Sequence, residues 1–435
     1  MKILIRNGHL IDPSQGVDGI GDVLIEDGMI KEVRVYCAGE RRKEKRQDGH
    51  GQSGIRIIEA NGFYVVPGLV DMHTHLREPG YEYKETIETG TKAGLHGGFT
   101  SLCAMPNTDP VNDDISVTEF ILREASSVGY ANVYPIGAIT KGERGEELTE
   151  MEMLKGAGCV AFSDDGVPVM NSLIMRRALE YSKIINVPII SHCEDINLSQ
   201  GGVMNEGFVS TSIGLRGIPN AAEEIMVARD IALCELTGGR LHIAHVSTRG
   251  SVRLIREAKK RGLKITAETC PHYFTLTDGS LMSYDTNLKV NPPLRTSEDV
   301  KAIKEGLADG TIDVIATDHA PHHHDDKNRE FDTAAFGISG LETALSLSLR
   351  LVHEGVLSIS QLIEKMSYIP ARILGINAGT LKVGSQADLT IVDMNKEFKV
   401  ESVRFLSKGK NTPFEGWILK GMPVITIYRG KVFEF

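Results

Sequence analysis

GFYVVPGLVDMHTH, residues 62–75, is an apolar run that ends in two histidines, and it is the first of eight such runs in the middle of the chain. The other seven are GGFTSLCAM (97–105), NVYPIGAI (132–139), CVAFSDD (159–165), VPIISHCE (187–194), RLHIAHVS (240–247), LKITAETC (263–270) and IDVIATDHAP (312–321). Most are rich in Val, Ile and Ala without strict alternation, which is typical of strands buried on both faces. Helix-like stretches lie between them, among them 119–128, 220–236 and 298–309. Eight strands alternating with helices over about 250 residues predict an α/β fold, a (β/α)8 TIM-type barrel.

Short β-rich segments with turn residues open and close the chain. KILIRNGHLID (2–12) and GDVLIEDGMIKEV (21–33) stand at the start, and QADLTIVDM (386–394) and MPVITIYRGKVFEF (422–435) stand at the end. Such segments read as strands and hairpins, and we expect the two ends to pair. We therefore predict a small β domain formed by residues 1–61 and 376–435, with the barrel domain over residues 62–375.

The charge balance excludes several classes of partner. The chain carries 48 basic and 58 acidic residues, a net charge of −10, which opposes general binding to nucleic acid or to an anionic membrane. No stretch approaches the ~18 consecutive apolar residues of a membrane span. The basic insert AGERRKEKRQDGHGQSG (38–54) is interpreted as a solvated hairpin loop rather than a nucleic-acid-binding tab. We predict no nucleic-acid or membrane partner.

Cysteine usage and the start of the chain indicate the compartment. The six cysteines lie far apart, and no two form a C-x-x-C pair. This pattern favours buried free thiols in a reducing compartment over a disulfide framework. The opening residues MKILIRNGHLIDP break their apolar run with polar residues and do not read as a signal peptide. We therefore predict a cytoplasmic location.

Residues that can bind a metal ion stand where five of the eight strands end. In a barrel of this kind the functional residues cluster at the C-terminal strand ends, because the loops that follow the strands build the site. The residues concerned are His73, His75, Asp164, Asp165, His192, His245, Asp318 and His319. Side chains alternate along a strand, so His73 and His75 point to the same side, ~6.6 Å apart along it. That spacing allows two imidazoles to hold one ion.

Each of these residues has an ordinary structural explanation when it is taken alone. A histidine near a strand end is commonly hydrogen-bonded in the core, and an aspartate after a strand commonly caps a helix. The combination of H-x-H, two further histidines and two aspartates predicts a metal site instead. Histidine and carboxylate ligands suit zinc or a similar divalent ion. One catalytic zinc takes three protein ligands, so this larger set fits two ions that share a bridge.

The motifs together resemble the cyclic amidohydrolases, and specifically type I dihydroorotase. They are VDMHTHLREPG (70–80), AMPNT (104–108), FSDDG (162–166), SHCED (191–195), AHVST (244–248), ETCPHY (268–273), KVNPPLR (289–295), ATDHAPH (316–322) and the trailing G-x-x-A-D-L-T-I-V-D (384–393). The resemblance runs nearly from end to end, and the insert 38–54 is the one evident departure. It implies a zinc-dependent hydrolase that interconverts N-carbamoyl-L-aspartate and dihydroorotate in pyrimidine biosynthesis.

The resemblance also implies which residues hold the metal. Two zinc ions per subunit are expected, the first held by His73, His75 and Asp318 and the second by His192 and His245. Many relatives bridge the two ions with a carbamylated lysine at the end of the fourth strand, where this chain has Asp164-Asp165. By motif position Asp165 is the ligand; alternation alone says only that one of the two faces inward, which leaves Asp164 as the fallback.

Roles in chemistry and substrate binding follow from the same motifs. A metal-bridging hydroxide is the expected nucleophile, and Asp318 is the expected general acid and base, because a carboxylate can carry the proton to the departing nitrogen. Arg77 supplies a planar cation for the substrate carboxylate, and Asn107 an amide donor. By family position the remaining substrate contacts are His75, Asn291, His322 and the backbone around Phe336 and Gly337. We expect structural roles for His272 and His319, and loop positions for His323 and His324.

Two other interpretations compete with this one. The first is another cyclic amidase, such as a hydantoinase or allantoinase, in which a lysine usually stands where Asp165 is. The second is a dihydroorotase-like subunit without catalysis that scaffolds aspartate transcarbamoylase; lost metal ligands would mark it, and every expected ligand is present here. An active enzyme can still assemble. We therefore expect three kinds of partner: the small-molecule substrate, aspartate transcarbamoylase in a complex, and further copies of this chain in a homo-oligomer.

Overall fold

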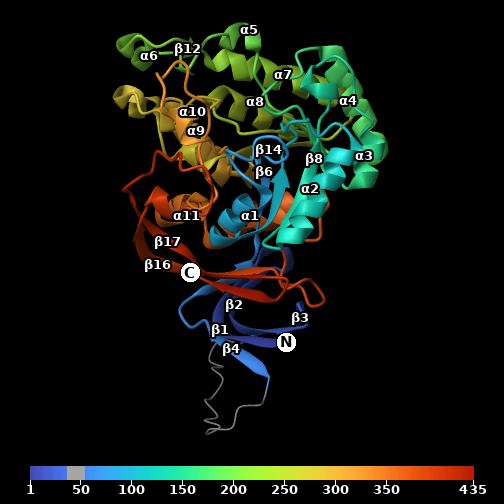
Figure 1. Cartoon of the computed structure of the whole chain (residues 1–435), viewed down its shortest axis with the longest axis vertical. Coiled ribbons are helices and arrows are strands. Elements are labelled where there is room, and N and C mark those ends of the chain that lie inside the picture. Colours follow the sequence, from blue (N-terminus) through green and yellow to red (C-terminus); the bar gives the residue numbers. More distant parts are fainter. Residues whose placement is uncertain (37–53) are drawn as a thin grey trace.

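The computed structural model describes residues 1–36 and 54–435. The insert predicted over 38–54 lies, except for Gly54, outside the described residues. A parallel sheet of eight strands forms the centre, in the order β15-β14-β13-β10-β9-β8-β7-β6 (Figure 1). The strands are β6 (Leu69–Thr74), β7 (Phe99–Ala104), β8 (Asn132–Gly137), β9 (Ala161–Ser163), β10 (Ile189–Ser191), β13 (Leu241–Ile243), β14 (Ile265–Thr269) and β15 (Val314–Ile315).

The sheet closes into a barrel between its first and last strands. Thr74 at the end of β6 pairs in parallel with His319, just beyond β15, and the backbone N–H of His75 donates to the carbonyl of His319 (2.9 Å). The (β/α)8 TIM-type barrel predicted from the sequence is therefore confirmed. Because the strands are parallel, all of their C-terminal ends open at one end of the barrel.

Helices cover the outside of the barrel and follow the strands in turn. They are α1 (Ile87–His96), α2 (Ile115–Val128), α3 (Met151–Ala157), α4 (Ser172–Ile185), α7 (Asn220–Thr237), α8 (Arg249–Lys260), α9 (Ser297–Ala308) and α11 (Ala344–His353), with α12 (Ile359–Ile363) and α13 (Ile369–Leu374) after them. Side-chain caps fix several of their starts; Thr248 Oγ1, for example, accepts from the backbone N–H of Ser251 at the start of α8. Their apolar faces and the outer face of the barrel sheet share one large core.

Short elements decorate the open end of the barrel. They are α5 (Ile196–Ser199), β11 (Met204–Asn205), α6 (Phe208–Ile213), β12 (Gly217–Ile218) and α10 (His324–Lys327). Figure 1 shows α5, α6 and β12 at the end of the molecule farthest from both chain termini. Among the described helices, none is both long enough and apolar enough to cross a bilayer.

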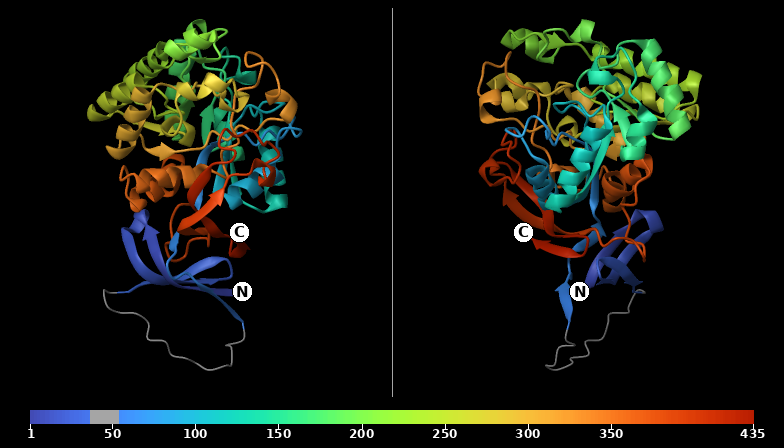
Figure 2. Two further views of the ribbon diagram at one scale, coloured as in Figure 1. Left: turned by 90° about the vertical axis from the view of Figure 1, so that its left-hand side faces the viewer. Right: turned by 45° about the vertical axis from the view of Figure 1, so that its right-hand side comes forward.

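The two ends of the chain build one sheet, as predicted. Its strands are β1 (Lys2–Asp12), β2 (Val17–Glu26), β3 (Met29–Val35), β4 (Ile55–Glu59), β5 (Tyr64–Pro67), β16 (Leu389–Lys399), β17 (Ile418–Tyr428) and β18 (Lys431–Glu434). β5 joins the halves, since it pairs in parallel with β1 and antiparallel with β16, where Val65 lies opposite Ile391. Both views in Figure 2 show this sheet beneath the barrel. The domain limits 1–61, 62–375 and 376–435 stay a prediction.

Several barrel strands are shorter than the apolar runs that announce them. The run 240–247 yields only Leu241–Ile243, and the run 312–321 yields Val314–Ile315. The backbone leaves the sheet geometry where the polar residues begin: His245 has φ 31° and Asp318 has φ 48°. Left-handed conformations are costly for residues other than glycine and occur in strained functional segments. The strand ends therefore give way to the loops that carry the site.

Candidate active site

The two histidines at the C-terminal end of β6, His73 and His75, each make a hydrogen bond through Nδ1. His73 Nδ1 lies 2.6 Å from Glu268 Oε1, and His75 Nδ1 lies 2.9 Å from Asn107 Oδ1. Both rings are buried, with centroids 5.5 Å apart. Hydrogen bonds at Nδ1 fix the orientation of each ring and leave Nε2 for a ligand. The spacing of H-x-H along the strand places these two Nε2 atoms side by side.

Asp165 lies between the two pairs of histidines. Its Oδ1 is 3.3 Å from His73 Nε2 and 3.6 Å from His245 Nε2, and its Oδ2 is 3.4 Å from His75 Nε2. His192 Nδ1 is 3.9 Å from the same Oδ1. Burial alone would raise the pKa of Asp165, but the charge of His73 and the neighbouring histidines hold it well below its ordinary value. The geometry matches a carboxylate shared by two ligand sets.

Asp164 faces away from this cluster. Its Oδ1 accepts from the backbone N–H groups of Ile139 (2.7 Å) and Thr140 (3.0 Å), and its Oδ2 accepts from the Thr140 hydroxyl. Burial raises the pKa of Asp164 to about 6, against the lowering effect of these hydrogen bonds. The Asp164 carboxylate thus ties the ends of β8 and β9 together, while its neighbour Asp165 contacts the histidines.

His192 and His245 form the second pair. His192 Nδ1 is 2.8 Å from His245 Nε2, and His192 Nε2 is 2.9 Å from Glu194 Oε2. Asn291 Nδ2 donates to the same oxygen of Glu194 (2.8 Å). Burial tends to raise the pKa of Glu194, but the hydrogen bond and charge of His192 outweigh it and lower the pKa to about 2. Asn291 is thereby linked to the histidine pair through an ionised carboxylate.

Asp318 completes the cluster from the loop after β15. Its Oδ1 lies 3.1 Å from His75 Nε2 and 3.6 Å from His73 Nε2. Its positive φ of 48° is a conformation that costs of order 1–3 kcal/mol for a residue with a side chain. Such strain is held only where the surroundings impose it, which is common at functional sites.

The residues present fit divalent metal ions. Two groups, His73/His75/Asp165 and Asp165/His192/His245, each bring three donor atoms within 4.8 Å of one another. His73 Nε2 and Asp165 Oδ1 are both buried and make no hydrogen bond, although they face each other. Buried polar atoms without partners are uncommon, and a metal ion is a partner that would satisfy both. Imidazole nitrogens and carboxylate oxygens are the donors that zinc and similar ions take.

Arg77 and His322 stand together at the edge of this cluster. The Arg77 guanidinium donates through Nε to the Pro321 carbonyl (3.3 Å), and its second nitrogen, Nη2, lies 3.4 Å from His322 Nε2. His322 Nε2 is 2.8 Å from the Phe336 carbonyl oxygen. Burial, together with the charge of Arg77, lowers the pKa of His322 to about 2, so this imidazole is neutral. The structure thus brings together three residues that the sequence assigned to the substrate.

The remaining predicted contacts lie around the same opening. Asn107 reaches His75 through its oxygen and the Asp165 carbonyl through its nitrogen (3.4 Å). Gly337 has φ 141°, and a Cβ there would meet the Ala320 carbonyl oxygen at 2.6 Å, so only glycine fits. His319 bonds instead to Glu85, 3.3 Å from its Nε2, and accepts from the Gly340 N–H (3.1 Å).

Two carboxylates beside the ligands, the buried Glu268 and the half-buried Glu194, were not singled out from the sequence, and His272 was expected to have a structural role. Glu268 holds His73 and also lies 3.2 Å from His242 Nε2, and Glu194 holds His192. His272 is buried with its Nε2 unpartnered, in a group of donor atoms with Cys270 and Asp318. All three stand inside the quoted motifs ETCPHY and SHCED, which was the available signal. The contacts of Glu268 join residues far apart in the chain, so spacing alone does not reveal them, whereas Glu194 stands only two residues from His192.

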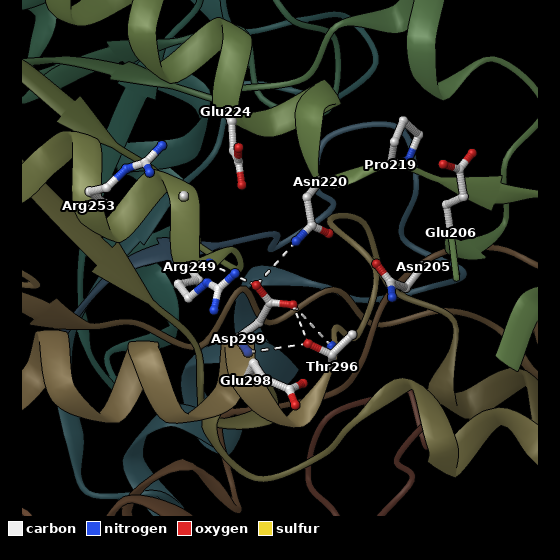
Figure 3. A pocket seen from close by; sticks show the side chains of 11 residues that line it. Asn205, Glu206, Pro219, Asn220, Glu224, Arg249, Arg253, Thr296, Glu298 and Asp299 are labelled. Carbon is white, nitrogen blue, oxygen red and sulfur yellow. Dashed lines mark hydrogen bonds between the residues drawn. The ribbon is translucent and has the colours of Figure 1, made fainter. Parts of the chain in front are cut away.

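A separate hollow of about 620 Å³ lies outside the histidine cluster, where α7, α8 and α9 begin (Figure 3). Figure 3 shows Asp299 pointing between Asn220 and Thr296. Asp299 Oδ1 accepts from the Arg249 N–H (2.8 Å) and from Asn220 Nδ2 (3.2 Å). A carboxylate of the chain itself therefore meets these helix N-termini. None of the residues lining this hollow belongs to the predicted site.

The fold is a closed parallel barrel joined to a β-sheet that both chain ends build. At the C-terminal end of the barrel a carboxylate lies between two histidine pairs. Together these features define the class of protein: an amidohydrolase-type barrel with metal-binding groups. Residues 62–251 match the family model described as dihydro-orotase-like. The chain is 56% identical over 432 residues to the dihydroorotase of Geobacter metallireducens, covering 99% of each, and 57% identical over 431 residues to that of Acetivibrio thermocellus, covering 99% of this chain and 98% of the relative. It belongs to the dihydroorotase family.

Solved structures agree on the architecture. The L-hydantoinase (dihydropyrimidinase) from Arthrobacter aurescens superposes with a TM-score of 0.86 at 26% identity, covering 99% of this chain and 95% of the other. A dihydropyrimidinase from Brevibacillus agri gives a TM-score of 0.80 at 23% identity with the same coverage, a likeness of fold alone. The identity to dihydroorotases is about twice as high, so the hydantoinase alternative is not favoured.

Proposed function

We propose that this protein is a dihydroorotase, which catalyses the reversible cyclisation of N-carbamoyl-L-aspartate to (S)-dihydroorotate in pyrimidine synthesis. One observation carries the proposal: the full-length identity to dihydroorotases extends over a site in which Asp165 stands between His73, His75 and His245. The half-buried Arg77 beside this cluster gives the substrate carboxylate a partner that a simple cyclic amide does not need.

The metal assignment is part of the proposal. His73, His75 and Asp318 would hold one zinc ion, His192 and His245 the other, and Asp165 both. When bound, such ions would supply a hydroxide nucleophile at neutral pH and would polarise the ring carbonyl. The support is the donor set itself, with His73 Nε2 and Asp165 Oδ1 buried and without hydrogen bonds.

Asp318 is proposed as the general acid and base. In the hydrolytic direction a C–O bond forms at the ring carbonyl and the C–N bond breaks. The Asp318 carboxylate takes the proton released by the attacking water and returns it to the departing nitrogen. Its position at a strand end, 3.1 Å from His75 Nε2, supports this role.

Arg77 is proposed to bind the substrate carboxylate in bidentate fashion, since its guanidinium makes only long contacts with Pro321 and His322. His322, Asn107, Asn291 and the Phe336–Gly337 backbone would contact the ring. The neutral imidazole of His322 carries one N–H, which faces the Phe336 carbonyl at Nε2, so Nδ1 would accept a hydrogen bond from the substrate without adding charge to the site.

Substrate discrimination tests the proposal. The purified chain is expected to hydrolyse dihydroorotate efficiently and dihydrouracil, the same ring without the carboxylate, poorly. Arg77→Met should erode this preference by at least tenfold in kcat/KM, because it removes a charge-assisted contact worth more than about 1.4 kcal/mol. Equal kcat/KM for the two rings in the unmodified protein would instead indicate a hydantoinase-like enzyme.

Assembly and location stay predictions from the sequence. A complex with aspartate transcarbamoylase and a homo-oligomeric state are expected for an active enzyme of this family, and a cytoplasmic location is expected from the cysteine pattern and the opening residues. Size-exclusion chromatography of the chain, alone and mixed with the transcarbamoylase, tests the first two.

A further inference from the structure

Two buried lysines lie beside the substrate pocket with no carboxylate on them. Lys289 is 1% exposed and Lys327 is 5% exposed. The Lys289 ammonium donates to the carbonyls of Phe331 (2.8 Å) and Asp332 (2.9 Å) and lies 4.5 Å from the centre of the Phe336 ring. The Lys327 ammonium donates to the carbonyls of Ala335 (2.8 Å) and Gly337 (3.1 Å). Among the described residues, neither ammonium has an acidic side chain within ion-pair distance.

These contacts bind one loop to another. The carbonyl of Lys289 itself accepts from the Gly337 N–H (2.9 Å) and from Lys327 Nζ (3.4 Å). Residues 331–337, which end in the Phe336–Gly337 pair, are thereby fastened to the segment that carries Asn291. Each lysine uses backbone carbonyls as partners, so what it fixes is the course of the main chain.

Burying the two ammonium groups carries a free-energy cost. Burying an ammonium is costly unless its hydrogen bonds are all made. Burial lowers the pKa of Lys289 to about 8, and burial together with the nearby charge of Lys289 lowers that of Lys327 to about 7. Two apolar side chains of similar length would avoid this cost but would leave the carbonyls of Phe331, Asp332 and Ala335 without the donors they now have, while Gly337 would keep Asn411.

The fastened loop reaches His322 directly through Phe336, and it is joined through Lys289 to the segment that carries Asn291. The Phe336 carbonyl meets His322, which lies against Arg77. On the other side, Asn291 stands two residues beyond Lys289 and bonds to Glu194. A shift of residues 331–337 would therefore displace contacts on two sides of the pocket at once.

We propose that Lys289 and Lys327 are positioning residues that clamp residues 331–337 against the 289–291 segment and so set the shape of the substrate pocket. The inference rests on the proposed function for the identity of the substrate. The clamp itself acts on the loop whether or not substrate is present, and it requires no contact between either lysine and the reacting atoms.

The test compares three lysine-to-methionine variants. Lys365 is a matched control: it is 6% exposed and its ammonium donates to the Ile312 carbonyl (2.7 Å), which precedes β15 and so lies at the end of the barrel away from the site. We expect Lys289→Met and Lys327→Met each to raise KM for dihydroorotate about tenfold with kcat changed less than twofold, the pattern of lost ground-state binding. Lys365→Met should leave KM unchanged.

Hydrogen exchange gives a second readout that does not depend on turnover. The amides of residues 331–337 should exchange slowly in the unmodified protein and at least tenfold faster in the Lys289 and Lys327 variants, or in the milder Lys→Gln versions if a methionine variant fails to fold. Unchanged KM and unchanged exchange in both site variants, or an equal rise in KM in Lys365→Met, would overturn the clamp. If the unmodified protein did not hydrolyse dihydroorotate, the proposed function alone would be overturned. The hydrogen-exchange rates of residues 331–337 would still test the clamp, because they do not depend on turnover.

Discussion

Asp165 and Asp164 are adjacent carboxylates with opposite orientations, and because of this difference Asp165 faces the histidines while Asp164 does not. The hydrogen bonds of Asp164 to Ile139 and Thr140 consume its oxygens, which leaves Asp165 for the histidines. The sequence motif pointed to Asp165, while strand alternation allowed either residue. The backbone donors that settle the orientation come from the end of the neighbouring strand, and no local pattern in the sequence shows them.

Asp318 is the residue whose replacement tests the proton transfer most directly. Asp318→Asn keeps a ligand oxygen but cannot carry a proton, so the metal content is expected to hold while kcat falls by about 10²–10⁴-fold. Steady-state kinetics and metal analysis on the same sample check this. Rates like those of the unmodified enzyme would remove Asp318 from the role.

Glu268 is expected to govern metal affinity from outside the ligand set. It bonds to His73 Nδ1, and loss of such a partner typically weakens metal binding by about 10–100-fold. Glu268→Gln should show this loss in a competition titration against a chelator. Glu85→Gln is the control, because Glu85 is an equally buried carboxylate that bonds to His319 rather than to a predicted ligand. Equal affinities for the Glu268 and Glu85 variants would contradict the assignment.

At the scale of elements, the eight β-runs placed all eight barrel strands, and the strand ends carry the residues that the barrel rule demanded. What the runs overstate is strand length, since the polar ends turn out of the sheet at His245 and Asp318. An apolar run in the sequence indicates which residues are buried. Residues stay buried beyond the point where a strand makes its last hydrogen bond to the neighbouring strand, so the run is longer than the strand. The lysine clamp could not be predicted from the sequence for a different reason. The lysines donate to backbone carbonyls, and every residue carries one, so no residue type marks the acceptors.

Strand β16 pairs with β5, the strand that joins the two halves of the terminal sheet. Replacing Ile391 in β16 tests how much that sheet contributes to the stability of the fold. Ile391 is fully buried opposite Val65, so Ile391→Ala should lower the free energy of unfolding by about 2–5 kcal/mol. Ile418→Ala in the neighbouring β17, where the side chain is 62% exposed, should change it by less than about 0.5 kcal/mol. Urea denaturation distinguishes the two, and a small effect at Ile391 would show that the sheet is dispensable for folding.

For the whole molecule, strands β3 and β4 and the histidine cluster stand at opposite ends of the barrel. The chain leaves the terminal sheet at Gly68 and enters β6, whose C-terminal end, which carries His73, points away from β3 and β4 (Figures 1 and 2). The insert predicted over 38–54 connects these two strands in the chain. Its removal is therefore expected to leave kcat/KM for dihydroorotate within about twofold. A large loss of activity, or salt-sensitive binding of DNA or RNA by the intact chain, would revive the nucleic-acid interpretation.

The most direct measurement of the central claim is dihydroorotate hydrolysis by the purified chain, followed as loss of the ring absorbance, with the metal content determined on the same sample. The site predicts turnover that disappears on chelation and returns when zinc is restored. A metal-loaded protein that leaves dihydroorotate unchanged, alone and with aspartate transcarbamoylase added, would contradict it.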